Sequence, residues 1–201
     1  ELQAGNGSWD YPGNRNNGDT SITQYALLGL WAAQRAGIAV PSAAWNRGAK
    51  WLLQYQLTTG NGNGAFAYHP APTGTNGRPD KEPSHSMTAA ASGSLMVARL
   101  HLYPNGRVAR RGSSGKKSTA TKQKFGVLKS IDFDAKEDKK NEPAKTKPEP
   151  SGPRVGMGSI DGAVNRGAGW LTRFYSVDRV RGLQSWPLYY LYALERMCAL
   201  A

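Results

Sequence analysis

The sequence predicts an all-α fold built from repeated helix pairs. Apolar residues recur at helical spacing in several segments, and no segment alternates apolar and polar residues for long. Two short motifs also occur twice. Residues 5–11 match residues 62–68, and residues 46–52 match residues 165–171 with six of seven positions identical. Because recurrence of this kind is the signature of a repeat protein, we predict a unit of roughly 50–65 residues.

The helices are expected in a fixed order within each unit. Asp19 or Thr20 is expected to cap the first helix and Ser42 the second, since both positions precede apolar residues at helical spacing. A turn rich in Gly and Asn then leads to an extended stretch with Phe66 and Tyr68. The predicted helices cover residues 22–35, 43–56, 86–102, 160–174 and 186–200.

Charge separates one segment from the rest of this 201-residue chain. The formal net charge is +12, and residues 106–153 hold 13 Lys/Arg against 6 Asp/Glu, which is more than half of the excess. That segment is rich in Lys, Ser, Thr, Pro and Glu, so we predict a basic, disordered insertion able to contact acidic surfaces. Residues 1–105 and 154–201 are predicted to form one repeat domain.

Several function classes are disfavoured by composition. No apolar run approaches the roughly 18 residues of a membrane span, so no transmembrane segment is expected. The insertion lacks the interleaved aromatic and basic residues that stack on single-stranded nucleic acid, so no specific nucleic-acid partner is expected. The single cysteine, Cys198, excludes an internal disulfide. Residue 1 falls inside a motif, and we therefore expect a piece of a longer protein.

Three imperfect copies of one motif run along the chain. The best copy has Arg47-Gly48, Trp51-Leu52, Gln56 and Gly60 in register, with its closing aromatic displaced to Phe66. The first copy keeps Gln3, Gly7 and Trp9, and the third keeps Arg166-Gly167 and Trp170-Leu171 but has Tyr175 where Gln is expected. The pattern resembles the QW motif of squalene and oxidosqualene cyclases.

The resemblance implies an α/α toroid, the fold of the terpene-cyclase, squalene-hopene-cyclase and protein-prenyltransferase superfamily. In such a fold the helices over residues 43–56 and 160–174 would be outer, and those over 22–35, 86–102 and 186–200 would be inner. About three repeats are present, so an incomplete ring is expected. In this family the motif Gln and aromatic are structural, tying the end of an outer helix to the turn that follows.

No catalytic residue can be assigned from the motifs. The chain lacks the Asp-x-Asp-Asp acid motif of squalene-hopene cyclases and the Asp, Cys and His zinc set of prenyltransferases, so neither a metal nor a cofactor is expected. Aromatic residues on inner helices either line a cavity or pack as core. The cavity-lining candidates are Asp19, Tyr25, His85, Trp186, Tyr189 and Tyr190.

Two of these candidates have simpler interpretations. Asp19 suits a helix N-cap, which would account for it without any chemistry. His69 and His85 flank a loop that contains Asp80 and Glu82, and this set is either a metal or general-base site or a group of exposed loop residues.

Two functional hypotheses follow. The first is a non-catalytic repeat module that binds an apolar small molecule or a protein, or has a structural role in a larger protein. The alternative is part of a terpenoid or isoprenoid cyclase or transferase whose catalytic residues lie elsewhere. A third possibility, binding of an acidic surface by the basic insertion, would weaken steeply with salt.

Overall fold

The computed structural model describes residues 3–13, 17–72, 80–104, 154–175 and 187–201. Within these ranges the chain is helical and has no strand, only an isolated antiparallel bridge between Phe66 and Ser84. The elements are α1 (Thr20–Arg35), α2 (Ser42–Tyr55), a 3-10 turn (Gly60–Gly62), α3 (His85–Leu102), α4 (Met157–Phe174) and α5 (Pro187–Leu200). The all-α prediction is confirmed. The predicted basic insertion lies outside the described residues.

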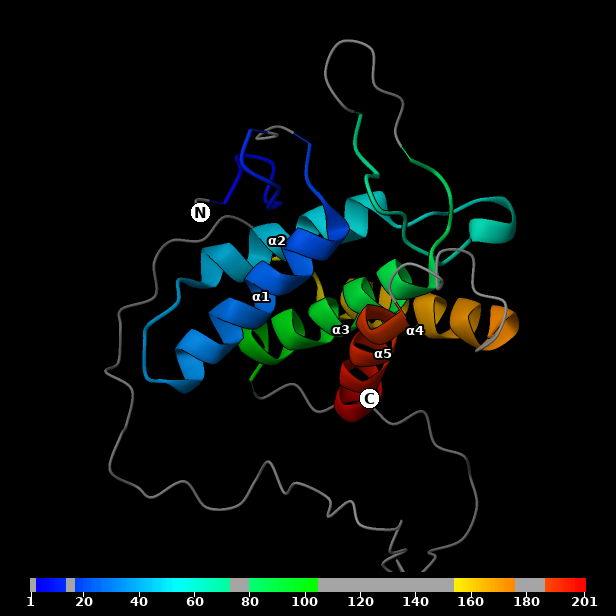
Figure 1. Cartoon of the computed structure of the whole chain (residues 1–201). Helices are drawn as coiled ribbons and strands as arrows, with labels where there is room; N and C mark the ends of the chain where they lie inside the picture. Colours follow the sequence, from blue (N-terminus) through cyan, green and yellow to red (C-terminus); the bar gives the residue numbers. More distant parts are fainter. Residues whose placement is uncertain (1–2, 14–16, 73–79, 105–153, 176–186) are drawn as a thin grey trace, which may run out of the picture.

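Helix α3 is the centre of the packing. It contacts each of the other four helices, and Figure 1 shows α1, α3 and α5 in one layer with α2 and α4 behind them. The middle of α3 runs Ala-Ala-Ala-Ser-Gly-Ser over residues 89–94, and every one of these residues is buried. Small side chains on all sides let four neighbouring helices approach one backbone.

Two of the predicted helix starts differ from those in the structure. Asp19 is the N-cap of α1, as expected, but Ser42 lies inside α2, where Pro41 occupies the N-cap without a side-chain hydrogen bond. Proline can take that place because its fixed φ suits the entry into a helix. Helix α4 begins at Met157, before the predicted start at Ile160, with Gly156 at its N-cap.

One buried glutamine joins the turn after α2 to α4. The Nε2 of Gln56 donates to the carbonyl oxygens of Gly64 (2.9 Å) and Ala163 (2.8 Å). Its Oε1 accepts from both Nε (3.1 Å) and Nη2 (2.6 Å) of Arg166. We call this four-residue arrangement the Gln–Arg clamp. It connects the turn after α2 to α4, the next helix of the same layer. The motif had suggested only a contact between the end of a helix and the turn that follows it.

The Gln–Arg clamp recurs at the start of the chain with the same atoms. Gln3 Nε2 donates to Gly7 O (2.8 Å) and Ala44 O (3.0 Å), while Gln3 Oε1 accepts from Arg47 Nε (2.9 Å) and Nη2 (2.6 Å). The equivalent contacts join two successive turns to α2 and to α4. The helix pairs are therefore a true structural repeat.

A glycine with positive φ lies under each clamp. Gly7 (φ 97°) lies close to α2, and Gly64 (φ 96°) lies equally close to α4. An added Cβ would lie 2.4 Å from Arg47 O at the first position and 2.5 Å from Arg166 O at the second. Gly60, which the motif register placed here, has open space around it. The four extra residues of this turn thus shift the motif glycine from Gly60 to Gly64.

We expect Gly64→Ala to lower the free energy of unfolding by more than about 2 kcal/mol, because alanine would combine a left-handed conformation with a backbone clash. Gly29→Ala is the matched control. That glycine lies exposed in α1 with nothing near its Cβ, so alanine should be neutral or stabilise the helix by up to about 1 kcal/mol. Urea denaturation followed by circular dichroism measures both, and equal effects would contradict the interpretation.

The two clamps also provide an internal comparison. Gln56 and its bonds to the two carbonyls are buried, whereas Gln3 is partly exposed and its contacts with Arg47 are exposed. Gln56→Leu leaves the carbonyls of Gly64 and Ala163 without their partner in a buried site, so we expect a loss of about 2–4 kcal/mol in the free energy of unfolding. Gln3→Leu should cost clearly less, because water replaces the lost partners. A larger loss for Gln3→Leu would show that the buried clamp is not a main stabilising contact.

Candidate functional site

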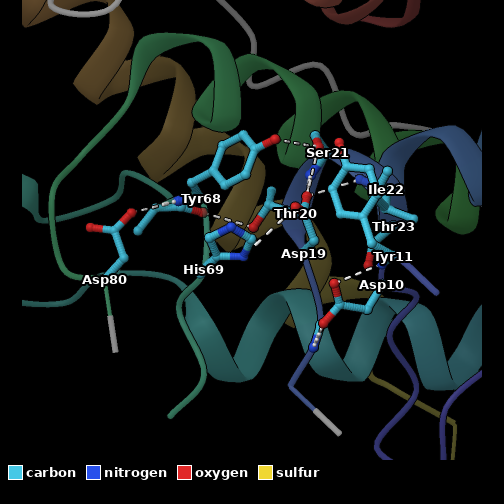
Figure 2. A network of polar contacts seen from close by, with 12 residues as sticks. Asp10, Tyr11, Asp19, Thr20, Ser21, Ile22, Thr23, Tyr68, His69 and Asp80 are labelled. Carbon is cyan, nitrogen blue, oxygen red and sulfur yellow. Dashed lines mark hydrogen bonds and ion pairs between the residues drawn. The ribbon is translucent and has the colours of Figure 1, made fainter. Parts of the chain in front are cut away.

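A buried carboxylate begins α1. Asp19 has no exposed surface, and its Oδ1 accepts hydrogen bonds from Ser21 N (2.7 Å), Ser21 Oγ (2.6 Å) and Ile22 N (3.0 Å), as Figure 2 shows. These donors belong to the first turn of the helix, where negative charge is favoured by the helix dipole. One oxygen of Asp19 is thus fully used as an N-cap.

The second oxygen of Asp19 faces an imidazole. Oδ2 is buried without a hydrogen-bond partner and lies 3.7 Å from Nδ1 of His69, whose side chain is 40% exposed. The ring of Tyr68 packs edge-on against that imidazole at a centroid distance of 4.5 Å. A carboxylate beside Nδ1 favours the proton on that nitrogen, which leaves Nε2 as an acceptor in the neutral ring.

The segment that carries His69 is held against the start of α1. Thr20 N donates to Tyr68 O (3.0 Å), and Thr20 Oγ1 donates to Ala67 O (2.8 Å). On its other side, Tyr68 N donates to Asp80 Oδ2 (3.2 Å), and Asp80 N donates to His69 O (2.8 Å). His69 is therefore positioned by backbone contacts with two parts of the chain (Figure 2).

Beyond Tyr68, which contacts His69, three further tyrosines lie close enough to Tyr68 or to one another to interact electrostatically. Tyr25 and Tyr189 bring α1 and α5 together with ring centroids 5.9 Å apart, and Tyr189 Oη donates to Gln24 Oε1 (2.5 Å). Tyr11 and Tyr25 are half-exposed. We call the group formed by these residues the tyrosine face, and it comprises Tyr11, Asp19, Tyr25, Tyr68, His69 and Tyr189.

Three phenols of the tyrosine face, those of Tyr25, Tyr68 and Tyr189, have raised pKa values. Burial raises the pKa of Tyr68 to about 12, with the nearby Asp19 charge adding to the effect, although a hydrogen bond from Ser21 opposes it. Burial raises the pKa of Tyr189 further, and the pKa of Tyr25 is raised chiefly by burial as well. At neutral pH the face therefore presents neutral hydroxyls and ring surfaces.

The structure divides the sequence-predicted candidates into two groups. Asp19, Tyr25 and Tyr189 lie in the tyrosine face. His85 and Tyr190 instead belong to the packing of α3, α4 and α5, where the ring of His85 is tilted against that of Trp170 with centroids 4.7 Å apart and its Nε2 lies 2.7 Å from Phe174 O. Trp186 lies outside the described residues.

His69 is the residue that sequence reasoning left undecided. The loop with His69, His85, Asp80 and Glu82 does not gather as a metal site, since the described part of the chain holds no group of three or more His, Cys, Asp or Glu able to bind an ion. A sequence signal for His69 lies in the alignment of the two motif copies, where Tyr68-His69 matches Tyr11-Pro12. A histidine that has no counterpart in the other copy is not required by the repeat.

Neither membrane spans nor known relatives add to this description. Each helix in the described ranges is too short or too polar to cross a membrane. Comparison with known proteins found no matching family model, no similar curated protein and no similar solved structure.

The raised phenol pKa predicts alkaline behaviour. The folded chain holds the Tyr68 proton more tightly than the unfolded chain, whose phenol has the ordinary pKa of 10.0, so this contribution to stability is complete below pH 10 and is lost as pH rises through about 12. We expect Tyr68→Phe to flatten the fall in stability over that window. The measurement is urea denaturation at several alkaline pH values with phenolate absorbance recorded in parallel, and an unchanged curve would contradict the assignment.

Proposed function

We propose that this chain is an α/α-toroid-type repeat module with a non-catalytic binding or structural role in a larger protein. The recurrent Gln–Arg clamp carries the proposal, because it adds each helix pair to the next in the same register. Contacts of that kind stabilise the fold and do not require a catalytic activity. Repeat proteins built from neighbour-to-neighbour interfaces commonly present extended surfaces for binding.

The arrangement of layers supports the toroid part of the proposal. The chain alternates between the layer of α1, α3 and α5 and the layer of α2 and α4. An inner and an outer ring would be generated by continuing this alternation. The all-α repeat is the firm observation, and the toroid is our extension of it.

The tyrosine face supports a binding role over a purely structural one. Tyr11 and Tyr25 expose about half of their surface (49% and 51%), and the imidazole of His69, which contacts Tyr68, is also partly exposed. Aromatic residues that stay exposed beside a positioned polar group are typical of binding surfaces. We propose this face as the ligand-binding surface of the module.

The isoprenoid-enzyme alternative depends on Asp19, the buried carboxyl beside aromatic rings. We give it second place because three hydrogen bonds to Oδ1 already explain that carboxyl as a helix cap. Fold likeness alone is not a warrant for activity.

A ligand screen separates these two functions. Native mass spectrometry and thermal shift of the purified chain with squalene, isoprenyl diphosphates, zinc and EDTA should give no saturable change in Tm. A ligand that binds only the folded state raises Tm by mass action. At a ligand concentration of one hundred times its Kd, the free energy of unfolding increases by about 2.7 kcal/mol. A saturable rise with squalene or an isoprenyl diphosphate, confirmed by bound mass, would overturn the proposal in favour of the enzyme.

A further inference from the structure

We propose that the tyrosine face binds a neutral, polyhydroxylated ring compound of the saccharide class, with Nε2 of His69 as an acceptor for a ligand hydroxyl. This inference rests on the binding role proposed above and names the chemistry of its ligand. Three properties of the face lead to it: a positioned acceptor, a negative local charge and exposed aromatic rings.

The acceptor is set up by the carboxylate behind it. Asp19 Oδ2 is completely buried, has no hydrogen bond and is directed at Nδ1 of His69. The two atoms lie 3.7 Å apart, longer than a hydrogen bond, so the carboxylate acts on the ring through its charge and favours the tautomer with the proton on Nδ1. Because an imidazole proton on Nδ1 leaves the other ring nitrogen as acceptor, the half-exposed ring suits a ligand that offers a hydrogen-bond donor.

The charge around the imidazole disfavours anionic ligands. Three carboxylates belong to the surrounding network, those of Asp10, Asp19 and Asp80 (Figure 2). Both oxygens of Asp10 accept backbone N–H groups, of Tyr11 (2.8 Å) and Gly18 (3.1 Å), and both oxygens of Asp80 do likewise. The chain has a formal charge of +12, yet the charged side chains of this network, apart from the imidazole, are carboxylates, which disfavour a phosphate or diphosphate beside them.

An organic cation fits less well than a neutral ligand. Tyrosine rings do attract cations. However, the one carboxylate oxygen that lacks a hydrogen bond, Asp19 Oδ2, is covered, so a cation has no direct ion pair to form. Neutral phenols and half-exposed ring faces at Tyr11 and Tyr25 instead match a ligand with C–H surfaces for the rings and hydroxyls for the polar groups.

The test is a binding titration of the whole chain. The ring nitrogens of ¹⁵N-labelled histidine would be followed by NMR while cellobiose, maltose, N,N′-diacetylchitobiose, pyrophosphate and tetramethylammonium are added separately. We expect saturable shifts of the His69 ring with at least one saccharide and none with pyrophosphate. Tyr25→Ala should weaken saccharide binding in this titration by about tenfold, and His69→Ala should weaken it by a similar factor when binding is measured by isothermal titration calorimetry.

Tyr175→Ala is the matched control, since Tyr175 is equally exposed (58%) but follows α4 and is not part of the tyrosine face. Binding should be unchanged in that variant. The inference is overturned if no saccharide moves the His69 signals, if pyrophosphate or tetramethylammonium binds more tightly than the saccharides, or if Tyr25→Ala has no effect. Each of these outcomes leaves the repeat-module proposal standing, because that proposal is tested by the separate isoprenoid screen.

Discussion

The Gln–Arg clamp is the constraint on which the other contacts depend. One buried amide, that of Gln56, serves two carbonyls from different parts of the chain and at the same time orients Arg166. The turn approaches the backbone of Arg166 this closely because Gly64 has no side chain. A buried amide or carbonyl without a hydrogen-bond partner is costly, so the glutamine, the glycine and the arginine of the clamp must occur together. The clamp therefore fixes how far apart α2 and α4 lie.

Contacts far apart in sequence then complete the packing around α3. Arg99 on α3 pairs with Asp161 on α4 at 2.5 Å, and Asn46 Oδ1 on α2 accepts from Val155 N at 2.8 Å. Tyr103 Oη also donates to Val155 O. The described residues on either side of the predicted insertion, Tyr103 and Val155, are thus held together.

The repeat could be predicted from sequence, but its partners could not. Helical spacing and the doubled motifs gave the helices to within a few residues, since those signals are local. The motif also marked Gln56 and Arg166, although they are 110 positions apart and only the folded chain shows that they pair. The tyrosine face was less predictable still. Its residues come from three segments, and the pairing of Asp19 with His69 has no local signature.

The difference between equivalent positions explains why the Asp19–His69 pair occurs at the start of α1 and has no counterpart at the start of α3. Asp19 N donates to Trp9 O as Ser84 N donates to Phe66 O, both at 3.0 Å, so the two residues cap their helices at matching places. Serine has a single side-chain oxygen, and the cap on α3 uses it. Aspartate can cap a helix and still direct a second oxygen at His69. The repeat thus keeps the capping role at both positions, and the extra oxygen at one of them is available for a function that the fold itself does not need.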